Sequence, residues 1–138
     1  MKIKKIDSSS YSKEIYYLLE NGEVYYKYSS WYTPEKLPLS NVVDIAASEN
    51  GYIALLEDGS IVIDRYVDSP NSFDYSGLSN IVTIKSEYNT DVYYALDSDG
   101  NLWGMGYSSY GNLGFVSNYI STPIVIYSRL DGEIKDFY

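Results

Sequence analysis

Carboxylates are the most numerous groups in this chain that could take part in acid–base chemistry. The sequence has nineteen Asp and Glu residues, no His and no Cys. It therefore lacks the commonest general base, the commonest metal ligand and the thiol nucleophile. Carboxylate pairs cleave glycosidic bonds only when they face each other across a cleft. Here the acidic clusters, such as Glu57-Asp58 and Asp97/Asp99, fall in or beside expected turns, where Asp bonds nearby backbone amides. We expect no catalytic residues and a protein that is not an enzyme.

Two motifs resemble ligand-binding loops, but structural interpretations fit both better. Asp97-Ser98-Asp99-Gly100-Asn101 has the first residues of a calcium loop, yet the further oxygen ligands and the closing Glu are missing. A hairpin turn accounts for it. The glycines at 104, 106, 111 and 114 are followed by no Lys-Ser/Thr pair, so they do not form a phosphate loop. We expect no metal and no cofactor.

The elements that position these residues are β-hairpins. In residues 92–114, VYYALDSDGNLWGMGYSSYGNLG, two β-compatible runs flank an Asp-Gly pair, which is a strong hairpin signal. Asn21-Gly22 and Asp58-Gly59 occupy the same place in two earlier hairpins. These pairs are typical of type I′ turns, in which both central residues have positive φ. We expect three turns of that type.

The hairpins belong to a repeat of about 40 residues. A short apolar strand precedes each hairpin, and its last Ile recurs at Ile6, Ile45 and Ile84, 39 residues apart each time. Residues 134–137 begin the motif again, and Thr122–Ile126 predicts an edge strand because Pro is tolerated there. The pattern predicts one all-β domain of propeller blades, with repeats at about 1–41, 42–80 and 81–132 and a fourth starting at 133–138.

The third repeat resembles the RCC1 (regulator of chromosome condensation) family. Gly106, Gly111, Leu113 and Gly114 stand at the family spacing, whereas Ser108 replaces the family's Asn and Asn112 its Gln. The first two repeats keep the strand and the turn but lack this loop. The resemblance implies antiparallel RCC1-like β-propeller blades, and a rigid platform whose loops grip a partner.

The number of repeats falls short of a full ring. Family members close about seven blades, and propellers generally need four or more. The strand motif occurs at both ends of this chain, at 3–6 and 134–137. Either a homodimer completes the ring, or one chain forms a small closed or open variant.

The charge is distributed unevenly along the chain. Residues 1–40 hold six Lys and five Asp or Glu, a balance of +1, and residues 41–138 hold four Lys or Arg and fourteen Asp or Glu, a balance of −10. A surface of that sign disfavours nucleic acid and anionic lipid, and suits a basic protein partner. Neither a secretory signal nor an apolar run long enough to cross a membrane is expected. We expect a cytoplasmic protein.

Aromatic and acidic residues outside the expected core are the candidates for contact with a partner. The eighteen Tyr residues suit binding surfaces, because Tyr offers a large contact area at small entropic cost. Trp103 aligns with Tyr25 and Val62 and is expected in the core. Trp31 lies in a connecting segment, where it either contacts a partner or covers the end of a blade. The candidate contact residues are Trp31, Tyr32, Asp64, Asp68, Asp74, Tyr107 and Tyr110.

These features favour a non-catalytic protein-binding module. Its sharper form is an inhibitor that docks an acidic, Tyr-rich face on a basic partner. By size and charge alone, the chain is similar to phage anti-CRISPR proteins, which occupy basic channels of RNA-guided nucleases, and this implies the cytoplasm of a bacterial host. The alternative is a carbohydrate or small-metabolite site lined by loop aromatics.

Overall fold

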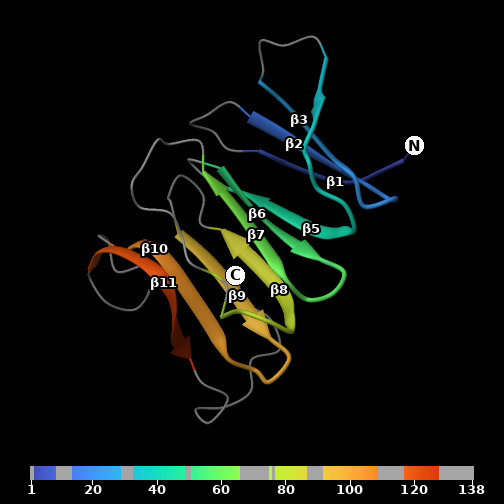
Figure 1. The fold of residues 1–138 in the computed structure, drawn as a ribbon. Coiled ribbons are helices and arrows are strands. Elements are labelled where there is room, and N and C mark those ends of the chain that lie inside the picture. Colours follow the sequence, from blue (N-terminus) through green and yellow to red (C-terminus); the bar gives the residue numbers. More distant parts are fainter. Residues whose placement is uncertain are drawn as a thin grey trace.

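The chain is built entirely from β-strands where its structure is described. The computed structural model describes residues 2–8, 14–28, 33–48, 51–65, 75, 77–86, 92–108 and 117–127. Within these ranges every regular element is a strand, and none is a helix. The strands form three antiparallel sheets that stand next to one another (Figure 1). The expected all-β class and antiparallel hairpins are confirmed.

Each sheet follows the chain order and is called a blade below. The first blade contains β1 (Ile3–Ser8), β2 (Glu14–Leu19), β3 (Val24–Tyr28) and β4 (Glu35–Lys36). The second contains β5 (Val42–Ala47), β6 (Gly51–Leu56) and β7 (Ile61–Arg65). The third contains β8 (Ile81–Ser86), β9 (Val92–Asp97), β10 (Leu102–Ser108) and β11 (Ser117–Tyr127).

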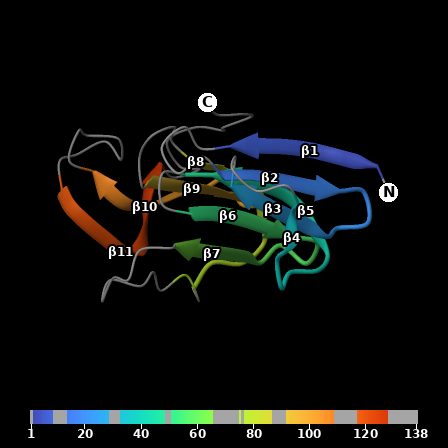
Figure 2. The ribbon, with the colours of Figure 1, turned by 90° about the horizontal axis from the view of Figure 1, so that it is seen from above.

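The strand that was expected at a sheet edge lies at the edge of the third blade. The expected strand over 122–126 is part of β11, which pairs with β10 and with no other strand of the described residues. Figure 2 shows β1 on one side of the molecule and the outer strands β7 and β11 on the other. Residues 133–138, the expected start of a fourth repeat, lie outside the described residues.

The three hairpin turns differ in type from the expectation. In the first turn the Gly22 amide donates to the Leu19 carbonyl (3.0 Å), and the Leu19 amide donates to the Glu23 carbonyl (2.9 Å). Gly22, Gly59 and Gly100 have φ of 85°, 85° and 88°, but the residues before them do not have positive φ. The type I′ prediction is therefore wrong. Each loop has three residues, a type I turn closed by a left-handed Gly, and this loop also uses an Asn-Gly or Asp-Gly pair.

The two larger hydrophobic clusters lie between neighbouring blades. One buried cluster joins the first and second blades, with Tyr16 and Leu18 of β2 against Ile45 of β5. A second cluster joins the second and third blades, with Ile53 of β6 against Ile84 of β8. A single four-stranded sheet has too little apolar surface to be stable alone, so neighbouring blades stabilise one another.

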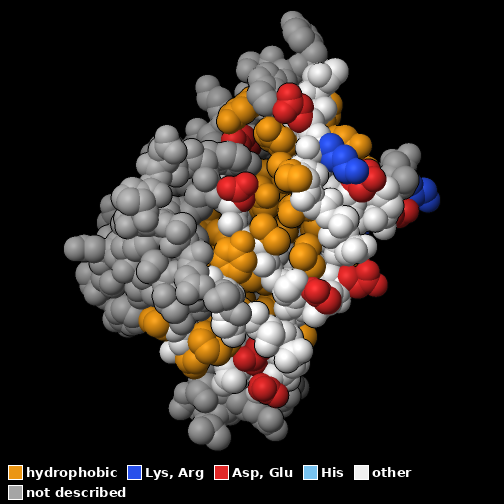
Figure 3. Space-filling model, viewed as in Figure 1, with side chains coloured by type: hydrophobic (Ala, Val, Ile, Leu, Met, Phe, Trp, Pro, Cys, Tyr) orange, Lys and Arg blue, Asp and Glu red, His pale blue; other side chains and the backbone are white. Residues whose placement is uncertain are grey.

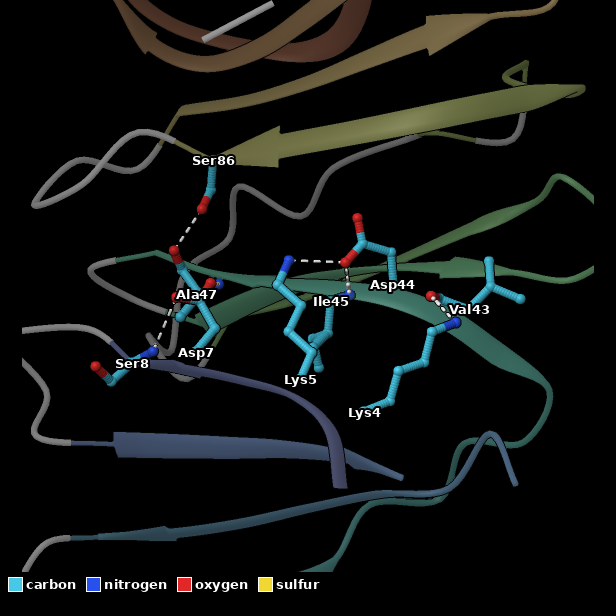
Figure 4. Close-up of polar contacts among 9 residues, drawn as sticks. All are labelled: Lys4, Lys5, Asp7, Ser8, Val43, Asp44, Ile45, Ala47 and Ser86. Carbon is cyan, nitrogen blue, oxygen red and sulfur yellow. Dashed lines mark hydrogen bonds and ion pairs between the residues drawn. The ribbon is translucent and has the colours of Figure 1, made fainter. Parts of the chain in front are cut away.

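A polar seam connects the first strands of successive blades (Figure 4). The Lys4 ammonium donates to the Val43 carbonyl (3.1 Å), and Lys5 pairs with Asp44 (2.7 Å). Both pairs join residues 39 apart, so equivalent positions of adjacent blades meet. The Ala47 carbonyl accepts a hydrogen bond from Ser86, again 39 residues away. The repeat spacing read from the sequence is therefore the spacing of blade-to-blade contacts.

Each of the first two turns is held by the blade that follows it. The Gly22 carbonyl accepts from the Val42 amide (3.1 Å), and the Gly59 carbonyl accepts from the Ile81 amide (2.9 Å). A Cβ on Gly59 would lie 3.1 Å from the Asn80 Cα, which is tighter than ordinary contact. These glycines are thus required both by their left-handed φ and by the close approach of the next blade.

Candidate interaction surface

Of the expected contact residues, only Asp64 has a described side chain. It is exposed on β7 and lies opposite Tyr52 of β6. Burial, with a further effect of the Asp64 charge, raises the pKa of Tyr52. Tyr107 lies in β10, but its side chain is outside the described residues. Outside them too are Trp31, Tyr32, Asp68, Asp74 and Tyr110. For these six, a role in contact stays a prediction.

Trp103, which was expected in the core, lies at its edge. It is half-buried, packs against the cluster between the second and third blades, and donates from Nε1 to an Asp97 carboxylate oxygen (3.0 Å). Asp97 also accepts from the Asp99 and Asn101 amides (3.0 and 2.9 Å). Partial burial opposes ionisation of Asp97, but these hydrogen bonds outweigh it and lower its pKa. The carboxylate therefore organises the turn, as the hairpin interpretation requires.

The hairpin turns place acidic side chains along one edge of the molecule. Because the three blades are equivalent, their turns fall on the same edge, and Figure 3 shows acidic side chains where Figure 1 places the turns. We call the exposed carboxylates of these turns the turn rim: Glu20, Glu57, Asp58 and Asp99. Sequence analysis gave the acids of the second and third turns a structural role only. The 39-residue repeat is the sequence feature from which the position of these acids along one edge could have been predicted.

The members of the turn rim differ in how far they also support the fold. Asp58 accepts hydrogen bonds from the Ser60 side chain and amide (2.5 and 3.0 Å), and these lower its pKa, so it stays ionised. Lys36 pairs with Glu23 in the first turn (3.1 Å) and offsets one carboxylate there. No hydrogen bond from the side chains of Glu20, Glu57 or Asp99 to another described residue is found. Their charges are available to a partner.

Two open hollows flank the junction of the first and second blades. One, of about 380 Å³, is lined by residues 36–40. The other, of about 310 Å³, is lined by Ser40, Asn41, Leu56, Glu57 and Asp58. Sugar sites commonly use aromatic rings among a few placed polar groups, and no aromatic side chain lines either hollow. These hollows give no support to the carbohydrate alternative.

Among the described residues, Glu14 is the one buried carboxyl group. Burial raises its pKa, although hydrogen bonds from the Tyr16 and Tyr28 hydroxyls work in the opposite direction. Glu14 is hydrogen-bonded to Tyr16 of the cluster between the first two blades and lines neither of the two hollows. Elsewhere in the described ranges, no three His, Cys, Asp or Glu side chains gather to hold a metal ion. No helix there is long and apolar enough to span a membrane.

The blades have the fold of RCC1-type propellers. Yeast RCC1 (Prp20), in a crystal structure with Kap60 bound, matches 90% of this chain with a TM-score of 0.73 at 18% sequence identity. Prp20p from Saccharomyces cerevisiae matches 93% with a TM-score of 0.67 at 14% identity, and human WBSCR16 matches 83% with a TM-score of 0.64 at 16% identity.

The likeness is one of fold and covers only part of these larger proteins. The chain spans 35%, 39% and 37% of their respective lengths. No protein-family model and no curated protein matches the sequence. The expected RCC1-like blades are confirmed, and activity and partners have to be argued from this chain's own surface.

Proposed function

We propose that this chain is a non-catalytic protein-binding module that docks an acidic face on a basic partner and inhibits it. The observation that carries the proposal is the turn rim, where equivalent turns of three rigid blades present exposed carboxylates along one edge. The net charge of −9 adds to the negative electrostatic potential of the rim. Complementary fields of this kind speed association and select partners of opposite charge.

Two groups of residues make the contact in this proposal. The turn rim supplies long-range attraction. Short-range contacts come from residues of β7, β10 and the connecting segments expected from the sequence, and these are Trp31, Tyr32, Asp64, Asp68, Asp74, Tyr107 and Tyr110. Tyr and Trp in such loops provide large contact area with few rotatable bonds. Rigid blades keep the ordering cost of binding low, because little of the scaffold has to change.

The partner in this proposal is a nucleic-acid-handling enzyme with a basic channel, such as an RNA-guided nuclease in a bacterial cytoplasm. An acidic module can occupy a channel that is lined to neutralise phosphates. Size and charge support this choice of partner. One neighbouring structure has Kap60 bound to yeast RCC1, and the other describes Prp20p with its binding properties to Gsp1p and histones, which agrees with a propeller as a protein-binding platform.

Capture of partners with charge-altered baits tests the proposal. The wild-type chain and the variant Glu20→Lys/Glu57→Lys/Asp99→Lys are used as baits in extracts of the native host. We expect basic proteins to be retained by the wild type and lost by the variant, and to elute as salt rises from about 50 to about 500 mM. Asp64→Lys/Asp68→Lys/Asp74→Lys tests the second group in the same way.

A further bait removes one negative charge at a position away from the rim. Asp44→Asn removes a carboxylate from the blade seam rather than from the rim, so it should capture the same proteins as the wild type. The proposal is overturned if the rim variant captures the same basic proteins at every salt concentration, or if the wild type retains none.

A further inference from the structure

Burial along the second strand of each blade shows that one face of the first blade is less covered than the other. In β6 and β9, five of the six residues are buried, so both faces of these strands are covered. In β2, buried and half-buried residues alternate along the whole strand. Side chains of a strand point to opposite faces in turn. The first blade is therefore covered on the face toward the second blade and more exposed on the other.

The more exposed surface, which we call the first-blade face, carries a group of apolar residues, namely Ile3, Ile6, Ile15, Tyr17, Leu19 and Tyr25. By the same register, Ser8, Lys27 and Lys36 lie on this side of the sheet. Ile3 and Ile6 are 51% and 57% exposed. Their equivalents Val42 and Ile45 are 3% and 0% exposed, because the first blade packs against them. Exposed aliphatic residues at positions that are otherwise interface positions indicate a surface that binds another protein.

The first-blade face is not shaped like the interfaces inside the chain. Tyr17 occupies the position held by Ala54 in the second blade and Ala95 in the third, where a small residue lets the neighbouring blade approach closely. Tyr25 stands where Val62 and Trp103 stand. A large, half-buried Tyr in place of Ala excludes close docking of another blade in the internal manner. Tyr is also enriched at the centre of protein–protein interfaces.

We propose that the first-blade face pairs with the same face of a second copy of this chain, which gives a two-fold symmetric dimer. A head-to-tail arrangement would need the outward face of the third blade. That face is already covered, since Val92 and Tyr94 of β9 are only 0% and 7% exposed and pack with Leu102 and Ile126. The first-blade face is thus the matching surface that remains, and pairing with itself is the commonest symmetry of homodimers.

The distribution of charge favours this arrangement. Residues 1–40 have a balance of +1, so two first blades can approach each other at little electrostatic cost. Glu57, Asp58 and Asp99, the exposed turn carboxylates of the second and third blades, would lie away from the paired faces in such a dimer. The turn rims stay separate, and each copy keeps its own acidic surface. The dimer rests on a surface independent of the proposed function.

Light scattering after gel filtration tests the dimer. The wild-type chain should elute with twice its mass of 15.7 kDa over a dilution series, at both low and high salt, because apolar burial holds it together. Ile6→Glu and Ile3→Glu change exposed side chains, so they should fold and elute at the mass of one chain. Val82→Glu changes a residue that is 54% exposed on the third blade and should remain dimeric.

Circular dichroism of Ile6→Glu shows whether its fold is retained, and Tyr17→Arg provides a second variant of the same face. A monomeric wild type, a dimer unchanged by Ile6→Glu and Tyr17→Arg, or an oligomer larger than two chains would overturn the proposal. The turn-rim variant should remain dimeric, so loss of partner capture and loss of dimerisation are separate results.

Discussion

At the scale of single residues, the glycine of each turn determines the backbone geometry of the turn, because it has the left-handed φ and the residue before it does not. Sequence analysis located all three turns but gave them the wrong type, because an Asn-Gly or Asp-Gly pair is compatible with a two-residue and a three-residue loop. Only the hydrogen bonds of the folded chain separate the two. The approach of Asn80 to Gly59 comes from the next blade, 21 residues further along the chain. No local pattern could have predicted it.

Gly59→Ala should lower the free energy of unfolding by about 1–3 kcal/mol, because a side chain in left-handed backbone is strained and its Cβ crowds the Asn80 backbone. Urea unfolding measures the change. Gly77→Ala is the matched control. Nothing lies within 4 Å of its new Cβ, so stability should change by less than about 1 kcal/mol. Equal effects of the two substitutions would contradict this account of the turn.

Glu14 should make stability depend on pH. Its pKa is raised by burial from the ordinary value of 4.5, so its contribution to stability is complete below that value and is lost as pH rises through the raised pKa. Glu14→Gln mimics the protonated form. The variant should therefore gain stability relative to wild type as pH rises from about 4 to about 8.

Urea titrations at several pH values follow the unfolding free energies of wild type and Glu14→Gln. The control Glu57→Gln changes an exposed carboxyl group and should follow the wild-type curve. A constant difference between Glu14→Gln and wild type at all pH values would show that burial of Glu14 does not raise its pKa.

At the scale of elements, strands and their order could be predicted, but their contacts only in part. The apolar runs and the 39-residue spacing predicted β1, β5 and β8 and the three hairpins. They did not predict that Lys5 meets Asp44 or that Asp7 bonds the Ala47 amide, because those contacts depend on how the blades pack. Acidic residues of the turns were likewise recognised one turn at a time, and only the packed blades bring them to one edge.

Asp7→Ala should destabilise the fold through the seam between the first two blades. The Asp7 carboxylate accepts from the Ala47 amide (2.8 Å), and its loss leaves that amide without its partner in a part-buried site. We expect a loss of about 1–3 kcal/mol. Lys36→Ala breaks an exposed ion pair instead and should cost less than about 1 kcal/mol.

Thermal and urea unfolding of both variants provide the comparison. If Lys36→Ala costs as much as Asp7→Ala, the hydrogen bond between Asp7 and Ala47 has no special part in joining the first two blades.

At the scale of the whole molecule, the chain is a set of equivalent blades whose cores lie between neighbours. That arrangement explains why two different surfaces result. The turns of the three blades lie along one edge and form an acidic rim, whereas the outer face of the first blade leaves apolar side chains such as Ile3 and Ile6 exposed. Fold class and the acidic balance were evident in the sequence. The apolar face was not, since Ile3 and Ile6 follow the same pattern as their buried equivalents.

The most direct measurement is the affinity of the purified chain for a captured basic partner, titrated at about 50 and about 300 mM salt with wild type and with Glu20→Lys/Glu57→Lys/Asp99→Lys. We expect salt to weaken wild-type binding at least about tenfold, and the substitutions to weaken it similarly at low salt. Binding that is equally tight at both salt concentrations, and unchanged by the three substitutions, would contradict docking through the acidic rim.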